Sequence, residues 1–218
     1  MNELASLNHG TSVTELRDSL SEFAQDEDIS LDEAVNRALA ESKASVREAK
    51  SVGSLASRGG ASVASSSGGS GTVTLGAATR KGDLFVSPAS TLFVQHSHTG
   101  IYYSTATIVE APGTGKNSRS IVSSSVKVGK GAVKQYVSTT STNRGKAANH
   151  AFNKLRGKGY NSNFAVNKST TGSKMNCSQL VWAAYKAATG IDLDGNGGLG
   201  VYPYNIKDSK KTVTYKTL

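Results

Sequence analysis

The strand-like segments of this chain form one group, and most of the helical patterns in its body follow that group. Short runs of β-branched and aromatic residues, separated by Gly, Pro, Ser or Asn, predict strands at residues 73–75, 84–86, 91–94, 101–103, 107–109, 120–128, 134–137 and near 212–215. Helical spacing predicts helices at residues 144–156 and from residue 177 onwards. Strands that are grouped apart from helices are typical of an α+β fold and not of a doubly wound parallel sheet.

Composition divides the chain into three segments. Residues 1–50 carry the capping boxes Ser12-x-x-Glu15 and Ser30-x-x-Glu33, which predict two short helices. Residues 51–72 are dominated by Ser, Gly and Ala, which is typical of a flexible linker. Residues 73–218 are numerous enough to bury a core of their own, and we expect them to form the main domain.

Charge is distributed very unevenly between these segments. The chain has a net charge of +9, to which residues 1–50 contribute −6 and residues 51–218 contribute +15. A body this basic attracts polyanions, such as nucleic acid, anionic lipid surfaces or a phosphate-rich, anionic cell-wall polymer. No helix-turn-helix, zinc-finger or RNA-recognition signature accompanies the charge, so sequence-specific binding of nucleic acid is not expected. We also expect the acidic N-terminal segment to contact the basic body.

The sequence leaves the location of the protein open. No stretch is long and apolar enough to span a membrane, and residues 1–10 show no secretory signal. The protein is therefore expected in the cytoplasm, or outside the cell or at its wall if a signal was removed. A single cysteine excludes an intramolecular disulfide and a metal cluster of several cysteines.

That cysteine, Cys177, lies where a helix is predicted to begin. Apolar residues recur at helical spacing after it, and Gly190 is a natural stop. In the first turn of a helix the unpaired N–H groups and the macrodipole favour an anion, so a thiolate forms more easily there. A lone cysteine is also often a small buried hydrophobic residue, and position alone does not separate the two interpretations.

Two other chemically useful residues lie on neighbouring predicted strands. His98 shares one strand face with His96, and Glu110 belongs to the next strand. The short connection implies an antiparallel hairpin, in which the carboxylate can reach the imidazole. A cysteine nucleophile needs such a base, and the base needs an acceptor that orients it. As an alternative, His96, His98 and Cys177 can bind a soft metal such as zinc, although their spacing is not diagnostic.

Five short motifs follow one another in a distinctive order. They are KGDLFV at residues 81–86, SHTGIY at 97–102, VEA at 109–111, Tyr160, and CSQLVW at 177–182. In this order, with His before Cys, the chain from roughly residue 80 to residue 210 resembles the permuted papain-like cysteine hydrolases of the YiiX/YaeF-like group. These are related to the NlpC-type cell-wall peptidases. The N-terminal segment and the linker lie outside the resemblance.

The resemblance implies a fold, a site and an activity. The fold is a papain-like, circularly permuted NlpC-type α+β domain, in which an antiparallel sheet packs on the helix that carries Cys177. Cys177 would be the nucleophile, His98 the general base, and Glu110 the residue that orients His98. Tyr160 would line the substrate site, and no metal or cofactor is implied. The implied reaction is cleavage of an amide through an acyl-enzyme, with peptidoglycan stem peptides as the substrate.

Other functions remain open at this point. Relatives with the same His-first order act on esters, so a lipid acyl hydrolase or acyltransferase can use the same Cys–His pair. A catalytically dead, basic wall-binding module is a third possibility. The acidic segment at residues 1–50 can be an inhibitor, a spacer or a pair of partner-docking helices.

Three further positions carry smaller predictions. Asp83 matches a Gly-Asp turn of the family, and we expect it to tie a loop. Gln179 stands where relatives often carry Glu, a departure that bears on substrate contacts. Asp192-x-Asp194-x-Asn196 resembles the start of a calcium loop, but Pro203 occupies the position of the bidentate Glu. We therefore predict a glycine-rich turn held by Asp and Asn side chains.

Overall fold

The computed structural model describes residues 1–58, 71–88 and 97–218. The body contains a six-stranded sheet with the order β5-β4-β3-β2-β7-β8, in which neighbouring strands pair antiparallel. Its strands are β2 (Leu84–Ser87), β3 (His98–Tyr102), β4 (Thr107–Glu110), β5 (Arg119–Val122), β7 (Val133–Val137) and β8 (Thr212–Thr217). The predicted strand at residues 91–94 and the residue His96 lie outside the described residues.

A second, two-stranded sheet pairs β1 (Thr72–Thr74) with β6 (Lys127–Gly129). The predicted segment 120–128 is therefore divided between two sheets. The short 3₁₀ helix η1 (Ser123–Ser125) separates β5 from β6, and the Ser125 hydroxyl donates to the carbonyl of Val122. Serine side chains that bond to nearby backbone compete with a strand ladder, which explains the break.

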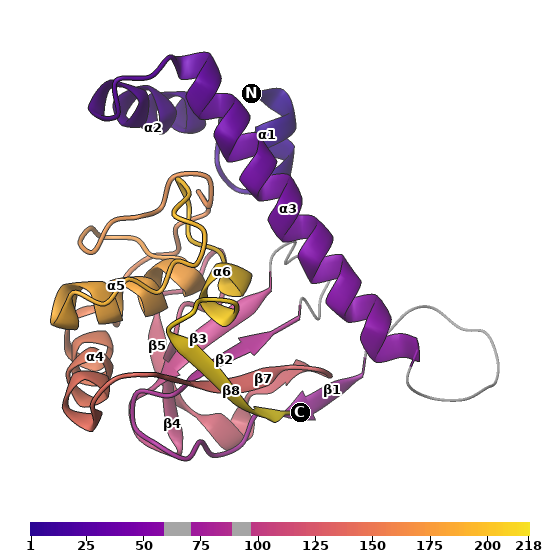
Figure 1. Cartoon of the computed structure of the whole chain (residues 1–218), viewed down its shortest axis with the longest axis vertical. Helices are drawn as coiled ribbons and strands as arrows, with labels where there is room; N and C mark the ends of the chain where they lie inside the picture. Colours follow the sequence, from indigo (N-terminus) through magenta and orange to yellow (C-terminus); the bar gives the residue numbers. More distant parts are fainter. Residues whose placement is uncertain (59–70, 89–96) are drawn as a thin grey trace.

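The helices of the body cover one side of the sheet. They are α4 (Ser141–Lys154), α5 (Cys177–Thr189) and α6 (Pro203–Lys207) (Figure 1). The predicted helix start at residue 144 is three residues late, because Thr140 is the N-cap and accepts a hydrogen bond from the N–H of Asn143. Helix α5 ends as predicted at Gly190, whose φ of 72° is a left-handed conformation that glycine adopts without strain.

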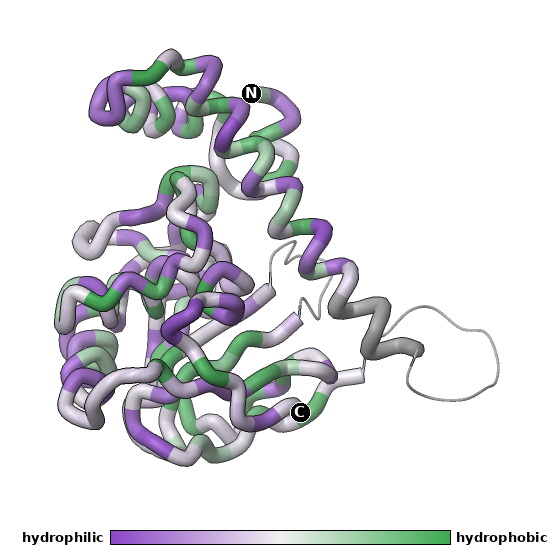
Figure 2. The backbone as a smooth tube through the Cα atoms, in the orientation of Figure 1, coloured by the Kyte–Doolittle hydropathy of each residue, from purple (hydrophilic) through white to green (hydrophobic). Residues whose placement is uncertain are grey.

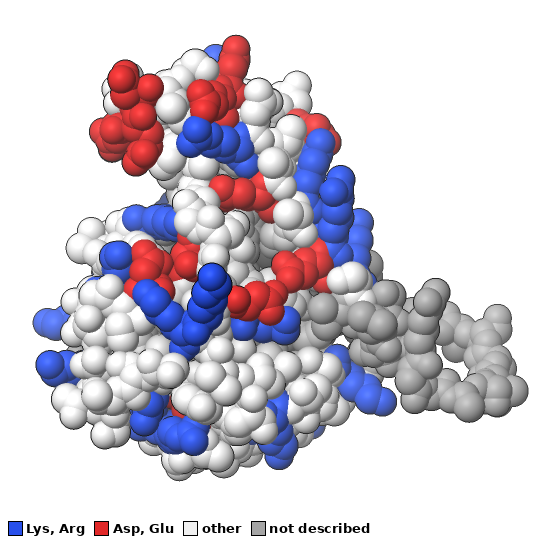
Figure 3. Space-filling model, viewed as in Figure 1, with Lys and Arg blue, Asp and Glu red and all other residues white. Residues whose placement is uncertain are grey.

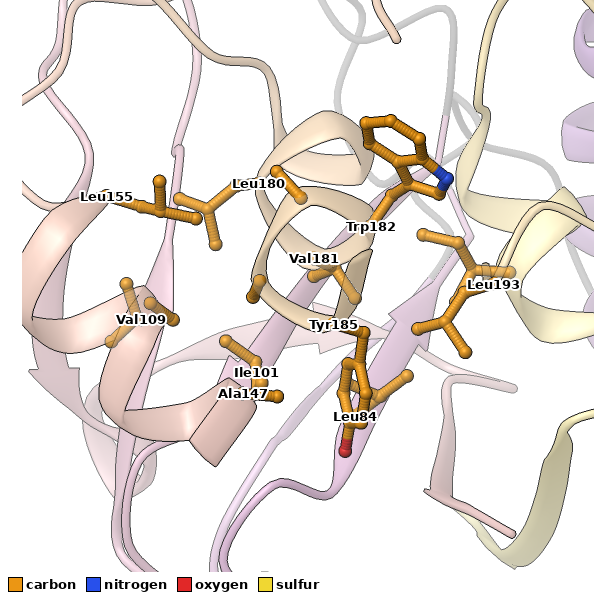
Figure 4. Close-up of a cluster of buried hydrophobic side chains, with 14 of the residues drawn as sticks. Leu84, Ile101, Val109, Ala147, Leu155, Leu180, Val181, Trp182, Tyr185 and Leu193 are labelled. Atoms are coloured by element: carbon orange, nitrogen blue, oxygen red, sulfur yellow. The ribbon is translucent and has the colours of Figure 1, made fainter. Parts of the chain in front are cut away.

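Helix α5 lies at the centre of the main hydrophobic core. All of its residues from Cys177 to Tyr185 are buried. Figure 4 shows its apolar side chains among those of the sheet and of α4; the labelled residues are Leu84, Ile101, Val109, Ala147, Leu155, Leu180, Val181, Trp182, Tyr185 and Leu193. Packing against the sheet and α4 holds the first turn of α5 in a fixed position, as the predicted α+β arrangement requires.

The N-terminal segment forms three helices, and not the two that were predicted. They are α1 (Asn2–Leu7), α2 (Val13–Asp26) and α3 (Leu31–Arg58). The predicted capping box at Ser12 and Glu15 is present. Helix α3 continues through the first eight residues of the expected linker, because Ala, Ser and Arg are compatible with a helix once it has been nucleated. Polar and apolar residues alternate along these helices, as in amphipathic helices (Figure 2).

These helices pack against the body. Leu4, Leu16, Leu20 and small residues of α2 and α3 form a buried cluster with Ala165 and Leu199. Figure 1 shows α3 running past the body with α1 and α2 at one end. In Figure 3, acidic side chains gather over the N-terminal helices, whereas most charged side chains on the lower body are Lys or Arg. None of the helices within the described ranges combines the length and apolar character needed to cross a membrane.

Candidate active site

A reciprocal cap fixes the start of α5 at Cys177. The side chain of Asn176 accepts a hydrogen bond of 2.8 Å from the N–H of Gln179, whose own side chain accepts one of 3.4 Å from the N–H of Asn176. This capping box leaves Cys177 in the first helical position, where its N–H has no acceptor within the helix. The sequence therefore places the sulfur at the positive end of the α5 dipole.

Gln179 serves this helix start. Its amide also bonds to the side chain of Asn161 and to the carbonyl of Ser169, and only 2% of the residue is exposed. Both polar atoms of the amide therefore have protein partners, and the expectation that this position bears on substrate contacts stays a prediction. The Gln side chain instead joins the start of α5 to the preceding loop.

His98 and Glu110 lie at corresponding ends of neighbouring strands. Residue His98 opens β3 and Glu110 closes β4, and the register pairs Ile101 with Val109 in an antiparallel ladder. The Nε2 atom of His98 is 2.8 Å from Oε2 of Glu110, so the predicted contact between imidazole and carboxylate is present. The ring of Phe85 packs edge-on against the imidazole, with 5.5 Å between the ring centroids.

The imidazole of His98 lies between this carboxylate and the thiol of Cys177. Burial is the largest single effect on the ring and lowers its pKa. Hydrogen bonds to Cys177 and Glu110, together with their negative charges, outweigh burial and raise the pKa of His98 to about 10. The arrangement therefore favours a protonated imidazole beside the sulfur. The sulfur also lies 3.9 Å from the carbonyl oxygen of Ser97, and Cys177 is only 2% exposed.

Arg119 is part of the same network, although it was not predicted from the sequence. Its Nε and Nη2 atoms donate to Oε1 of Glu110 at 2.9 and 2.8 Å. Burial raises the pKa of Glu110, but the hydrogen bonds and positive charges of His98 and Arg119 outweigh burial and hold it below its ordinary value. In the β4–β5 register Glu110 is directly opposite Arg119, so aligning the two strands as a hairpin would have revealed an opposite-charge pair.

Aromatic side chains surround the sulfur. Cys177 packs with Phe164 and Tyr202, whose rings stack with 5.9 Å between centroids, and Tyr160 packs against this cluster. Burial raises the pKa of Tyr160, and the nearby Cys177 raises it further. The structure therefore places Tyr160 beside the sulfur. Phe164 and Tyr202 were not selected as site residues, because a loop aromatic carries no sequence signal for what it packs against.

Two of the smaller predictions are confirmed. The buried carboxylate of Asp83 accepts hydrogen bonds from the backbone of Arg80 and the hydroxyl groups of Thr79 and Tyr215, so it ties the loop before β2. In the glycine-rich turn, Asp192 and Asp194 accept from the backbone N–H groups of Asp194 and Asn196, and also from other side chains.

The alternative metal site cannot be assembled from the part of the chain that the structure describes. His96, its third ligand, lies outside that part. Within residues 1–58, 71–88 and 97–218, no three His, Cys, Asp or Glu side chains are grouped so that they could hold a metal ion.

Comparison with known proteins identifies the family. A family model described as "Permuted papain-like amidase enzyme, YaeF/YiiX, C92 family" matches residues 78–217. The chain belongs to this family. It is therefore a cysteine hydrolase of the papain-like amidase type with the permuted papain-like fold, as predicted.

Two individual proteins are also similar. The uncharacterized protein YycO of Bacillus subtilis (strain 168) is 34% identical over 219 residues, which cover 99% of this chain and 85% of that protein. The crystal structure of the metalloprotein yiiX from Escherichia coli O157:H7 is similar with a TM-score of 0.45 and 17% identity, over 64% of this chain and 97% of that chain. The match to YycO includes the N-terminal helices, whereas the family model begins at residue 78.

Proposed function

We propose that this amidase cleaves an amide bond in the stem peptides of peptidoglycan through an acyl-enzyme on Cys177. The observation that carries the proposal is the position of His98, which lies beside Cys177 on one side and is hydrogen-bonded on the other to the Glu110 carboxylate. Nucleophile, base and orienting acceptor in that order are the arrangement that thiol-dependent acyl transfer requires.

The proposed reaction has two stages. First, the Cys177 thiolate attacks the carbonyl carbon, and the C–N bond breaks as the His98 imidazolium gives its proton to the departing amine. The N–H of Cys177 is available to stabilise the oxyanion, a contribution of about 3 kcal/mol per donor in better-studied hydrolases. Second, water attacks the thioester while His98 accepts its proton, and the acid and the free thiol are released.

Glu110 and Arg119 act through His98 in this proposal. Glu110 fixes the orientation of the imidazole and stabilises its charged form. Arg119 is a positioning residue, since its two hydrogen bonds to one carboxylate oxygen leave the other oxygen directed at His98. Tyr160 borders the sulfur and is the proposed substrate contact.

The charge of the body supports the choice of substrate. Residues 51–218 carry a net charge of +15, which suits an anionic bacterial wall, and the NlpC-type relatives of the family act on such walls. A digest of muropeptides identifies which bond of the stem peptide is cut.

Muropeptides digested with the full chain and analysed by mass spectrometry provide the test. We expect cleavage by the wild type and a loss of at least about a thousandfold in Cys177→Ala and His98→Ala. His150→Ala is a matched control on α4, and circular dichroism verifies that each variant is folded. Full activity of Cys177→Ala would end the covalent mechanism. Thiol-dependent turnover of acyl-lipids without muropeptide cleavage would reassign the substrate, and binding to wall polymer without turnover would identify a binding module.

A further inference from the structure

The N-terminal helices reach the part of the body that holds Cys177. The hydroxyl of Ser42, on α3, is 2.8 Å from the hydroxyl of Tyr202, and both residues are buried. Tyr202 is one of the residues that pack against Cys177. One side chain therefore separates α3 from the sulfur, although α3 lies outside the matched family region.

Helix α3 also reaches the strands beside His98. Two turns after Ser42, Ala49 packs against Val86, Val133 and Tyr204. Val86 is next to Ser87, which pairs directly with His98 in the β2–β3 ladder. The two turns of α3 between residues 42 and 49, about 10 Å of helix, thus extend from the side chains beside the nucleophile to the strand beside the base.

The sulfur is closed off in this arrangement. Cys177 is only 2% exposed, and 24% of the His98 side chain is exposed. A substrate carbonyl has to approach to about 3–3.5 Å from the sulfur before it can react. Among the described residues, Phe164, Tyr202 and Tyr160 pack around the sulfur. Because Ser42 holds Tyr202, movement of α3 would free one wall of this enclosure.

A polar anchor holds α3 in place. The two carboxylate oxygens of Glu41 accept hydrogen bonds from the N–H groups of Leu199 and Gly200, at 2.9 and 3.1 Å. A Cβ atom on Gly198 would collide with the Glu41 carboxylate in this position, so a side chain there would displace the anchor. Hydrogen bonds to a charged group contribute more than neutral ones, so this contact favours the docked position of α3.

We propose that the N-terminal helices are a docked cover of the active site, and that Cys177 admits substrate when the α3 stretch around Glu41 and Ser42 moves off the body. This inference rests on the proposed function, in which Cys177 is the nucleophile. The contacts that define the cover do not depend on which substrate is used.

A carboxyl pair links α3 to α6 at the other end of this stretch. Glu48, next to Ala49 on α3, faces the side chain of Asp208 at the end of α6, and Lys207 and Tyr204 of α6 also face it. Burial is the largest effect on Glu48, and the neighbouring Asp208 adds to it, so the pKa of Glu48 rises to about 7. Ionisation of Glu48 would place two negative charges together and weaken the docked state.

The rate of alkylation by iodoacetamide tests the cover, because Cys177 is the single cysteine of the chain. In the full chain, Glu41→Ala and Ser42→Ala should each raise the rate, Glu41→Ala by about tenfold or more since it removes two charged hydrogen bonds. Glu33→Ala is the matched control, because this acidic side chain of α3 pairs with Arg37 of the same helix.

A variant that is expected to slow alkylation excludes partial unfolding as the cause of the rate changes. At pH 8, Glu48→Gln should slow alkylation below the wild-type rate, since the amide can donate to Asp208 without repulsion, and unfolding cannot slow the reaction. Unchanged rates in Glu41→Ala and Ser42→Ala would overturn the cover. Faster alkylation in variants that cleave no muropeptide would support the cover while refuting the proposed substrate.

Discussion

Replacing Glu110 by Gln removes one negative charge and leaves the shape of the side chain unchanged. The carboxylate is 3% exposed and 2.8 Å from the His98 ring. A hydrogen bond to a charged group contributes about 1.5–3 kcal/mol, which corresponds to about 1–2 pKa units. Burial disfavours the charged ring, so it does not compensate for the lost stabilisation by Glu110. The pKa of His98 should fall from about 10 to roughly 8–9.

Titration by NMR of the imidazole resonances measures this change directly. The chain has four histidines, so a His98→Gln sample assigns the signal. The same loss of free energy should lower kcat/KM for amide cleavage at neutral pH by about ten- to a hundredfold. Glu33→Gln removes an equal charge on the exposed side of α3 and should change neither quantity.

An unchanged pKa of His98 in Glu110→Gln would refute the reasoning, because it would mean that the carboxylate does not stabilise the charged ring. A lowered pKa with full activity would refute only the link between the charge of His98 and the chemical step. The two measurements therefore separate the electrostatics of the site from the proposed role of Glu110.

Two further changes test the network and the cover. Arg119→Ala should lower kcat by about three- to thirtyfold with little change in KM. Arg119→Lys should restore part of the lost kcat, since lysine keeps the charge but cannot make both hydrogen bonds to Glu110. A change confined to KM would contradict a positioning role. The raised pKa of Glu48 means that its contribution to docking is fully present below its ordinary pKa of 4.5 and is lost as pH rises through about 7. The alkylation rate of the wild type divided by that of Glu48→Gln should therefore rise by roughly three- to tenfold between pH 5 and pH 8. The change is modest because solvent screens this half-exposed pair. A constant ratio would show that Glu48 does not affect docking.

The local parts of the site were accessible from the sequence. The strand pattern, the short turn and the capping chemistry predict a hairpin with His98 and Glu110 and a helix that starts at Cys177, and each depends on residues a few positions apart. Errors occurred where a boundary depends on more than the local pattern. The extent of α3 is one case, and the division of residues 120–128 between two sheets is another.

The cross-strand partner Arg119 is an intermediate case. Its pairing with Glu110 depends on the register of β4 and β5, which the sequence implies only after the two segments have been recognised as neighbours. The contact between Tyr202 and Ser42 is harder to predict from the sequence, because the two residues are 160 positions apart and no motif links them.

Local chemistry was enough to identify a helix that begins with a thiol and a strand pair that brings a carboxylate to an imidazole, because hydrogen-bonding geometry over a few residues constrains both. The meeting of the Cys177 thiol with Ser97, which is 80 positions earlier and directly precedes β3, depended on how α5 packs on the sheet. So did the docking of α3 over Tyr202. Contacts of that kind arise from the burial of complementary surfaces, which is proportional to area and not directional, and so leaves no periodic trace in the sequence.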